Sequence, residues 1–254
     1  MGAEWPPAGG GGTPSTLTLW DGTVEQDPLH ASSDYFNDGA TLDPQWEEWD
    51  VGGHITVSQA DGAVKLSQPT SAGDDYGGII TPAPTDTQWC VTARMRLSSR
   101  FNPLNPCVGS LIIGEDLAAV GGNPSTGSFA NSQILHSSAG VQWEGTIYSN
   151  YTTFADSFGS DPTPASHVCY LRWYVDLDAG VAGEITPLVS ADGRTWIHYP
   201  SKALSGSAIS AIDSIGIASA NLTGQDMRLS CDLFRIDLTS DPRFPIGGHP
   251  SVLV

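Results

Sequence analysis

Apolar and polar side chains alternate along most of the chain from residue 34 onward. Over residues 87–97, every second side chain is apolar and those between are mostly polar, and residues 167–178 repeat this pattern. A period of two with one apolar face is typical of a strand in an antiparallel sheet with one face buried. The first apolar set is Trp89, Val91, Ala93, Met95 and Leu97; the second is Cys169, Leu171, Trp173, Val175 and Leu177.

Shorter runs of the same kind, separated by turn residues, predict further strands. Asp61-Gly62 and Asp192-Gly193 are dipeptides that favour hairpin turns. Helical periodicity is limited to single turns expected at 115–120 and 207–212. The remaining strands are expected at 54–58, 63–67, 77–81, 108–114, 132–137, 141–149, 183–190, 195–199, 214–220 and 227–238. Many short strands between Gly and Pro predict an all-β fold, a two-sheet antiparallel sandwich or a barrel.

The two ends of the chain differ from this pattern. Residues 1–33 are rich in Gly and Pro, which predicts an extended arm, and residues 241–254 predict an extended tail. The arm still carries four large apolar residues that a plain linker would not need. Two interpretations remain open: they dock on a neighbouring subunit, or they pack on the chain's own domain at 34–240. These residues are Trp5, Leu17, Leu19 and Trp20.

Charge excludes some functions. The chain of 254 residues has a formal net charge of −18 with only 10 Lys and Arg, so nucleic-acid binding, which needs a basic surface, is not expected. No apolar run is long enough to span a membrane, and the first residues lack the pattern of a signal peptide. Cys90, Cys107, Cys169 and Cys231 lack metal-motif spacing, and their pairing stays open.

Several segments, in order, resemble the concanavalin A-like lectin and glucanase family. Residues 34–38 followed by Leu42-Asp43-Pro44-Gln45-Trp46 are similar to its opening, and 91–97 to its long strand. Residues 190–196 are similar to its late Ser-x-Asp-Gly-x-x-Trp hairpin, and 232–236 to its closing strand. The resemblance spans about residues 34–238 and implies a jelly-roll sandwich.

The family pattern also pairs the first strand with the last. That pairing implies a candidate Ca²⁺ site at Asp34, Asn37, Asp38 and Asp232, although Ca²⁺ takes six to eight oxygen ligands and these residues alone are insufficient. No other cofactor is expected. The Gly/Pro-rich arm before this domain resembles bacteriophage tail, fibre or head-decoration proteins, which implies a virion location; secretion is the alternative.

Catalysis is not expected from the residues. Glycosidases of this fold use carboxylates spaced as Glu-x-Asp-x-x-Glu, and the nearest match, Glu48-Trp49-Asp50, has Gly53 at the third acidic position. Glu144 lacks a second carboxylate nearby. We therefore predict a protein that is not an enzyme.

Carbohydrate binding is the better interpretation, because sugars stack on aromatic rings while amides and carboxylates bind their hydroxyls. Residues 141–151 are rich in such groups. Trp143 and Tyr148 have opposite parity, so only one of them can face a given side of one strand. The candidate residues are Gln142, Trp143, Glu144, Tyr148, Asn150 and Tyr151.

These observations favour a phage virion structural protein that displays a lectin-like domain. It would contact copies of itself and other virion proteins, and it would act in assembly or in adhesion to host-surface glycan. A free carbohydrate-binding module and a divergent glycoside hydrolase are the alternatives.

Overall fold

The computed structural model describes residues 30, 32–37, 41–50, 55–68, 75–99, 107–117, 127–137, 140–150, 153–161, 168–180, 183–205, 207–221 and 227–238. Four predictions fall partly or wholly on residues outside these ranges. They concern the arm with Trp5, Leu17, Leu19 and Trp20, the tail from residue 241, the helical turn expected at 115–120, and the site residues Asp38 and Tyr151.

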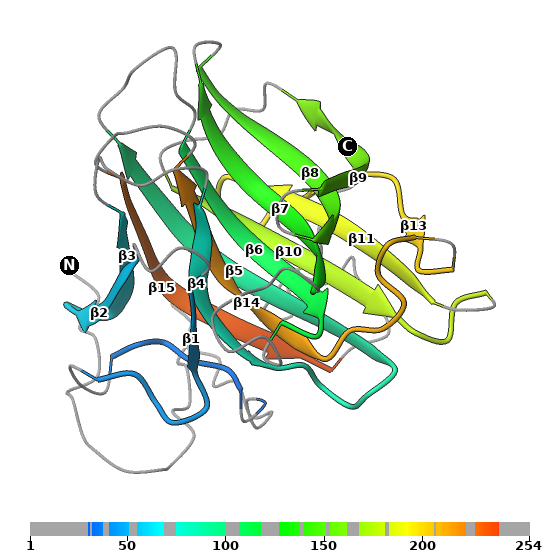
Figure 1. Cartoon of the computed structure of the whole chain (residues 1–254), viewed down its shortest axis with the longest axis horizontal. Coiled ribbons are helices and arrows are strands. Elements are labelled where there is room, and N and C mark those ends of the chain that lie inside the picture. The colour runs from blue at the N-terminus through cyan, green and yellow to red at the C-terminus, as the bar shows by residue number, and fades with distance from the viewer. Residues whose placement is uncertain are drawn as a thin grey trace.

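The described chain forms two antiparallel sheets packed face to face, as Figure 1 shows. The first sheet has seven strands in the order β1 (Glu47–Asp50), β4 (Asp75–Pro82), β14 (Ser214–Asn221), β6 (Cys107–Glu115), β7 (Ser128–Ser137), β8 (Gly140–Asn150) and β9 (Thr153–Asp161). The second, eight-stranded sheet runs β12 (Ile197–His198), β11 (Glu184–Ser190), β10 (Val168–Asp176), β5 (Gln88–Ser99), β15 (Met227–Asp237), β3 (Ala63–Gln68) and β2 (Thr56–Ala60), with β13 (Lys202–Ala203) beside β11. The predicted all-β sandwich is confirmed.

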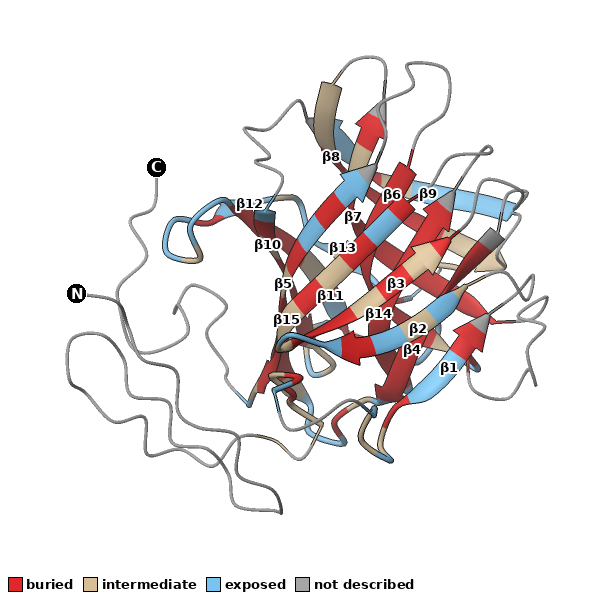
Figure 2. Cartoon of the chain, turned by 90° about the vertical axis from the view of Figure 1, so that its left-hand side faces the viewer, coloured by how far each residue is buried: buried red, intermediate tan, exposed pale blue. Residues whose placement is uncertain are grey.

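The main core lies between the two sheets and is built from the alternating residues that the sequence singled out. Trp89, Trp173 and Leu111 are fully buried there. The indole Nε1 of Trp173 on β10 donates to the carbonyl of Leu111 on β6 at 3.0 Å, so a hydrogen bond joins the two sheets. Figure 2 shows the buried residues gathered in the central strands, whereas the edge strands β2, β9 and β12 are largely exposed.

The start and the end of the domain meet at one place. Asp34 pairs with Phe234 of β15 through two backbone hydrogen bonds, as the family resemblance implied. The Asp34 carboxylate accepts hydrogen bonds from the backbone N of Phe36 at 2.6 Å and from Nε1 of Trp46 at 2.7 Å. The rings of Phe36, Trp46 and Phe234 contact one another in the core. The opening segment is therefore anchored on the closing strand.

Several local predictions differ from the structure. Strands β1, β9 and β13 were not expected, because their sequences alternate weakly and each lies at or near a sheet edge. The helical turn expected at 207–212 was wrong, since those residues form no helix. The carboxylate of Glu115 instead accepts hydrogen bonds from the backbone N atoms of Ser210 and Ala211. All four cysteines are buried and none forms a disulfide bond, and burial raises the pKa of Cys169 to about 12.

The outward face of the seven-stranded sheet is strongly concave. Tyr76 on β4 and Tyr148 on β8 stand four strands apart, which in a flat sheet is ~19 Å. Their ring centroids nevertheless lie 5.8 Å apart. Trp49 on β1 and Phe129 on β7 are also four strands apart, with centroids at 5.7 Å. Side chains can meet over such a span only if the sheet curves around them, and we call this concave face, which the rings occupy, the concave groove.

Two glycines permit this curvature at the junction of β4 and β14. A Cβ at Gly78 would overlap the carbonyl oxygen of Ile217 and lie 2.8 Å from Cα of Ala218. A Cβ at Gly216 would overlap the carbonyl oxygen of Ile79 and lie 2.9 Å from Cα of Ile80. These obstacles are backbone atoms, so a larger residue would have to push the two strands apart.

We predict that Gly216→Ala lowers the free energy of unfolding by about 2–3 kcal/mol, the upper range for overpacking, because β14 must move away from β4. The matched control is Ala220→Gly on the same face of the same strand, which should cost only about 1 kcal/mol. Urea denaturation measures both. Equal losses in the two variants would show that the close approach of β4 and β14 is unimportant.

Candidate functional site

Polar side chains occupy the floor of the concave groove on three neighbouring strands. The strand register places Ser110 of β6 opposite Gln133 of β7, and Gln133 opposite Glu144 of β8. Two residues before Gln133 on β7, Asn131 lies opposite Thr146 of β8. These residues alternate with inward core residues such as Ile134, so their side chains point into the groove. We call Ser110, Asn131, Gln133 and Thr146 the polar floor.

The polar floor is buried and incompletely hydrogen-bonded. Ser110 and Asn131 are 0% exposed, and Gln133 and Thr146 are 2% exposed. Gln133 Nε2 donates to the carboxylate of Glu144 at 2.8 Å. Among the described residues, no partner is found for Ser110 Oγ, Asn131 Nδ2, Asn131 Oδ1, Gln133 Oε1 or Thr146 Oγ1. Buried polar atoms are normally paired, so five such atoms on one patch are exceptional.

An aromatic cluster formed by Trp49, Tyr76, Phe129 and Tyr148 spans the groove beside this floor. Phe129 stacks on Tyr148 with ring centroids 5.1 Å apart and an interplanar angle of 14°. The hydroxyl groups of Tyr76 and Tyr148 lie 3.4 Å apart. Trp49 is buried, and its Nε1 also lacks a partner within the described part of the chain. The groove thus combines ring faces with unpaired donors and acceptors.

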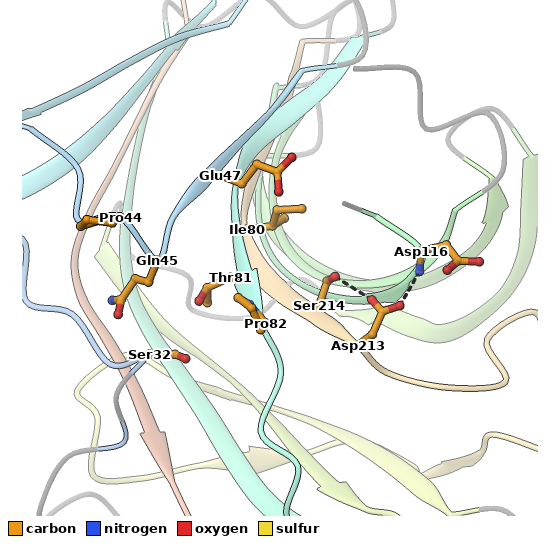
Figure 3. A pocket seen from close by; sticks show the side chains of 10 residues that line it. All are labelled: Ser32, Pro44, Gln45, Glu47, Ile80, Thr81, Pro82, Asp116, Asp213 and Ser214. Atoms are coloured by element: carbon orange, nitrogen blue, oxygen red, sulfur yellow. Dashed lines mark hydrogen bonds between the residues drawn. The ribbon is translucent and has the colours of Figure 1, made fainter. Parts of the chain in front are cut away.

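A cavity of about 790 Å³ opens at one end of the groove. In Figure 3, Glu47 and Ile80 lie near its upper side, and Asp116, Asp213 and Ser214 lie together on another. Glu47 and Ile80 pair across β1 and β4, in the same row of the sheet as Asn131. The complete lining is Ser32, Pro44, Gln45, Glu47, Ile80, Thr81, Pro82, Asp116, Asp213 and Ser214.

Hydrogen bonds hold the acidic end of this cavity in place. Asp213 accepts from the backbone N of Asp116 at 2.9 Å and from the hydroxyl of Ser214 at 2.6 Å. Next to Asp116, burial by itself raises the pKa of Glu115. Hydrogen bonds from Ser210 and Ala211 outweigh burial and leave that pKa below its usual value. The carboxylate of Glu115 therefore stays ionised and fixes the loop that precedes Asp213.

The structure brings together part of the site predicted from sequence. Gln142, Glu144 and Tyr148 share the parity that faces the groove, whereas a register shift between Tyr148 and Asn150 removes Asn150 from this alternation. Trp143 does not: it is buried in the main core, stacks on Tyr199 and donates Nε1 to Ser132 Oγ at 2.9 Å. Strand alternation separates it from Glu144 and Tyr148, so Trp143 is not part of the groove.

The residues proposed for Ca²⁺ have other interactions. The Asp34 carboxylate binds Phe36 and Trp46, and Asp232 accepts hydrogen bonds from Arg94 at 2.6 and 2.5 Å. Within the described ranges no group of three or more His, Cys, Asp and Glu side chains is placed to hold a metal ion. Asp38 lies outside those ranges, so the Ca²⁺ site stays a prediction.

Sequence reasoning missed the polar floor and Trp49. Asn131 was not assigned to any strand, and Ser110 and Thr146 looked like ordinary positions within strands. One signal was present, since Ser110 is the polar side chain in the otherwise apolar run at residues 107–114. A polar residue at the centre of such a run is the feature that points to a site.

No protein-family model and no curated protein sequence matches the chain. Solved structures do share its fold. The carbohydrate recognition domain of Emp47p matches with a TM-score of 0.53 and 12% identity, over 82% of this chain and 96% of that one. A xylan β-1,4-xylosidase from Bacillus halodurans matches with a TM-score of 0.56 and 13% identity, over 85% of this chain and 41% of that one. An engineered GH43 glycoside hydrolase matches with a TM-score of 0.57 and 13% identity, over 87% of this chain and 43% of that one.

The chain therefore has the two-sheet jelly-roll fold that these structures share. The sequence predicted that the chain is not an enzyme. That exclusion was wrong, because the same fold occurs in glycoside hydrolases. The chain spans less than half of those hydrolase chains, and at this identity the likeness shows the fold alone. The described residues contain no helix long and apolar enough to cross a membrane.

We predict that Thr146→Val raises the free energy of unfolding by about 1 kcal/mol, because it removes an unpaired buried hydroxyl at nearly constant volume. The matched control is Ser132→Ala on the other face of neighbouring β7. It removes the partner of Trp143 Nε1 and should lower the free energy by about 1 kcal/mol. Thermal unfolding without ligand measures both. A loss of stability in Thr146→Val would mean that this hydroxyl is satisfied.

Proposed function

We propose that this chain is a carbohydrate-binding domain that holds a saccharide in its concave groove. The unpaired donors and acceptors of the polar floor, lying beside the aromatic cluster, are the observation that supports this function. The lectin-like fold adds support, since a carbohydrate recognition domain is among the proteins that share it.

The energetics favour a ligand rich in hydroxyl groups. Each buried polar atom without a partner costs about 1–3 kcal/mol, so the six atoms of the floor and of Trp49 favour anything that can pair with them. Asn131 offers both a donor and an acceptor, and Ser110 and Thr146 offer hydroxyls that do either. A hydroxyl group also donates and accepts. We propose that sugar hydroxyls pair with these groups in the complex.

Other ligand classes fit this groove less well. A purely apolar ligand would leave the floor unpaired, which would keep its energetic cost. Nucleic acid is disfavoured by the net charge of −18. In the proposed complex the C–H faces of a saccharide pack on Tyr148, which is partly exposed, and its hydroxyls pair with Asn131 and Thr146, which requires the side chains that cover these two residues to move aside. The cavity of about 790 Å³ at the end of the groove has the volume of an ordinary ligand site.

Display on a phage particle is the setting we propose for this domain. Its support is the sequence of residues 1–33, where apolar residues interrupt a Gly/Pro-rich arm.

We predict that Asn131→Leu weakens saccharide binding at least tenfold, about 1.4 kcal/mol, while leaving the unfolding free energy equal or higher. A glycan array identifies a ligand for the unmutated protein, and calorimetry then measures its affinity for the variant. Ser132→Ala serves as the control, because it changes the next residue of β7 on the opposite face and should leave affinity unchanged. An unmutated protein that binds no glycan would contradict the proposal.

Glycoside hydrolysis in the same groove is the second candidate function. Glu144 and Glu47 both face the groove, and enzymes of that class share the fold. Two carboxylates on either side of a glycosidic bond are the basic requirement for this reaction.

If the groove hydrolyses its ligand, Glu144→Gln should lower the rate by more than about 100-fold, the contribution of one general acid or base, while binding persists. Reducing-end release from the saccharide identified on the array measures the rate. Absence of cleavage by the unmutated protein excludes the second candidate and leaves the binding proposal intact.

A further inference from the structure

Basic side chains are concentrated on the side of the molecule away from the groove. Six of the chain's 10 Lys and Arg residues alternate with core residues such as Leu66, Ala93 and Leu229, so they point out of the eight-stranded sheet. They are Lys65, Arg94, Arg96, Arg172, Arg228 and Arg235.

The groove side has the opposite character. None of the seven strands β1, β4, β14, β6, β7, β8 and β9 contains a Lys or an Arg. Lys202 reaches the edge strand β9, where Asp156 neutralises it. Glu47 and Glu144 face the groove, and Asp116 and Asp213 line the cavity at its end. Every formal charge on a strand residue that faces the groove is therefore negative.

This distribution decides which saccharides the groove can hold. Within the described part of the chain, an anionic group moved from water to the buried floor would meet no cation, and an unpaired buried charge is strongly unfavourable. The surrounding carboxylates and the net charge of −18 add repulsion. A neutral hydroxyl carries neither penalty, and the amide and hydroxyl groups of Asn131, Ser110 and Thr146 can pair with it.

We propose that the concave groove selects saccharides without acidic groups and rejects those carrying carboxylate or sulfate. This inference rests on the proposed function and adds the ligand class. Glu47 is the residue best placed to test it, because it is exposed and lies at the open end of the groove in the same row as Asn131.

Neighbouring Glu48 provides a matched control. It is also exposed, but it pairs with Ile79, whose side chain lies in the main core, so it faces away from the groove. Glu47→Lys and Glu48→Lys change the net charge equally and differ only in the side of β1 that they alter. A difference between the two variants therefore reports local electrostatics in the groove.

The experiment compares neutral xylo-oligosaccharides and gluco-oligosaccharides with oligogalacturonates of the same length, using the full chain and calorimetry. Binding in the groove is taken as the part of the measured binding that Asn131→Leu abolishes. This criterion separates it from binding to other surfaces of the protein. We expect neutral ligands to bind at least roughly tenfold more tightly than oligogalacturonates. Glu47→Lys should strengthen oligogalacturonate binding roughly threefold, whereas Glu48→Lys leaves it unchanged.

Two results would overturn this inference while the proposed function stands. One is Asn131-dependent binding of oligogalacturonates that equals that of neutral ligands. The other is an equal response to Glu47→Lys and Glu48→Lys. Failure of the whole neutral and acidic series to bind in an Asn131-dependent manner would instead overturn the proposed function.

Discussion

The close approach of β4 and β14 is the constraint on which the rest of the site depends. Without a Cβ at Gly78 and Gly216, the two backbones come near enough for the seven-stranded sheet to curl. The curl brings Trp49 and Tyr76 on one side of the groove into contact with Phe129 and Tyr148 on the other. A flatter sheet would separate these rings and expose the polar floor to bulk water.

Burial of the polar floor has opposite effects on stability and on binding. Enclosure removes Asn131 and Thr146 from bulk solvent without giving them protein partners, which costs free energy in the folded state. The same enclosure would strengthen each hydrogen bond to the proposed ligand, since the surroundings have a low dielectric constant. The main core between the sheets, with Trp173 hydrogen-bonded across them, supplies the stability that tolerates this cost.

The two outer faces of the sandwich have different electrostatic roles. On the eight-stranded sheet, Arg94 pairs with Asp232 and Arg235 pairs with Asp237, while Arg172 lies 4.1 Å over the ring of Trp196. These contacts keep the basic side chains on that face, and hydrogen bonding by Asp232 raises the pKa of Arg94. The concave face is left with uncharged polar groups and carboxylates, which is the basis for the proposed selection of neutral ligands.

The sequence by itself determined the fold class and much of the strand order along the chain. Alternation of period two is a local property. The buried faces of residues 87–97 and 167–178 could therefore be predicted without any tertiary information. The parity rule also showed that Trp143 and Tyr148 point to opposite sides. Edge strands such as β9 could not be predicted in this way. Alternation results from burial of one face, and that burial is weak where a strand has a neighbour on one side only.

Only the tertiary structure decided which positions form the site. Ser110, Asn131 and Thr146 lie far apart in the chain and meet because β6, β7 and β8 are adjacent in register. Trp49 joins Phe129 because the sheet curves, and curvature depends on backbone contacts between strands that no local pattern records. Local periodicity determines which way a side chain points, whereas strand pairing and curvature determine what it meets.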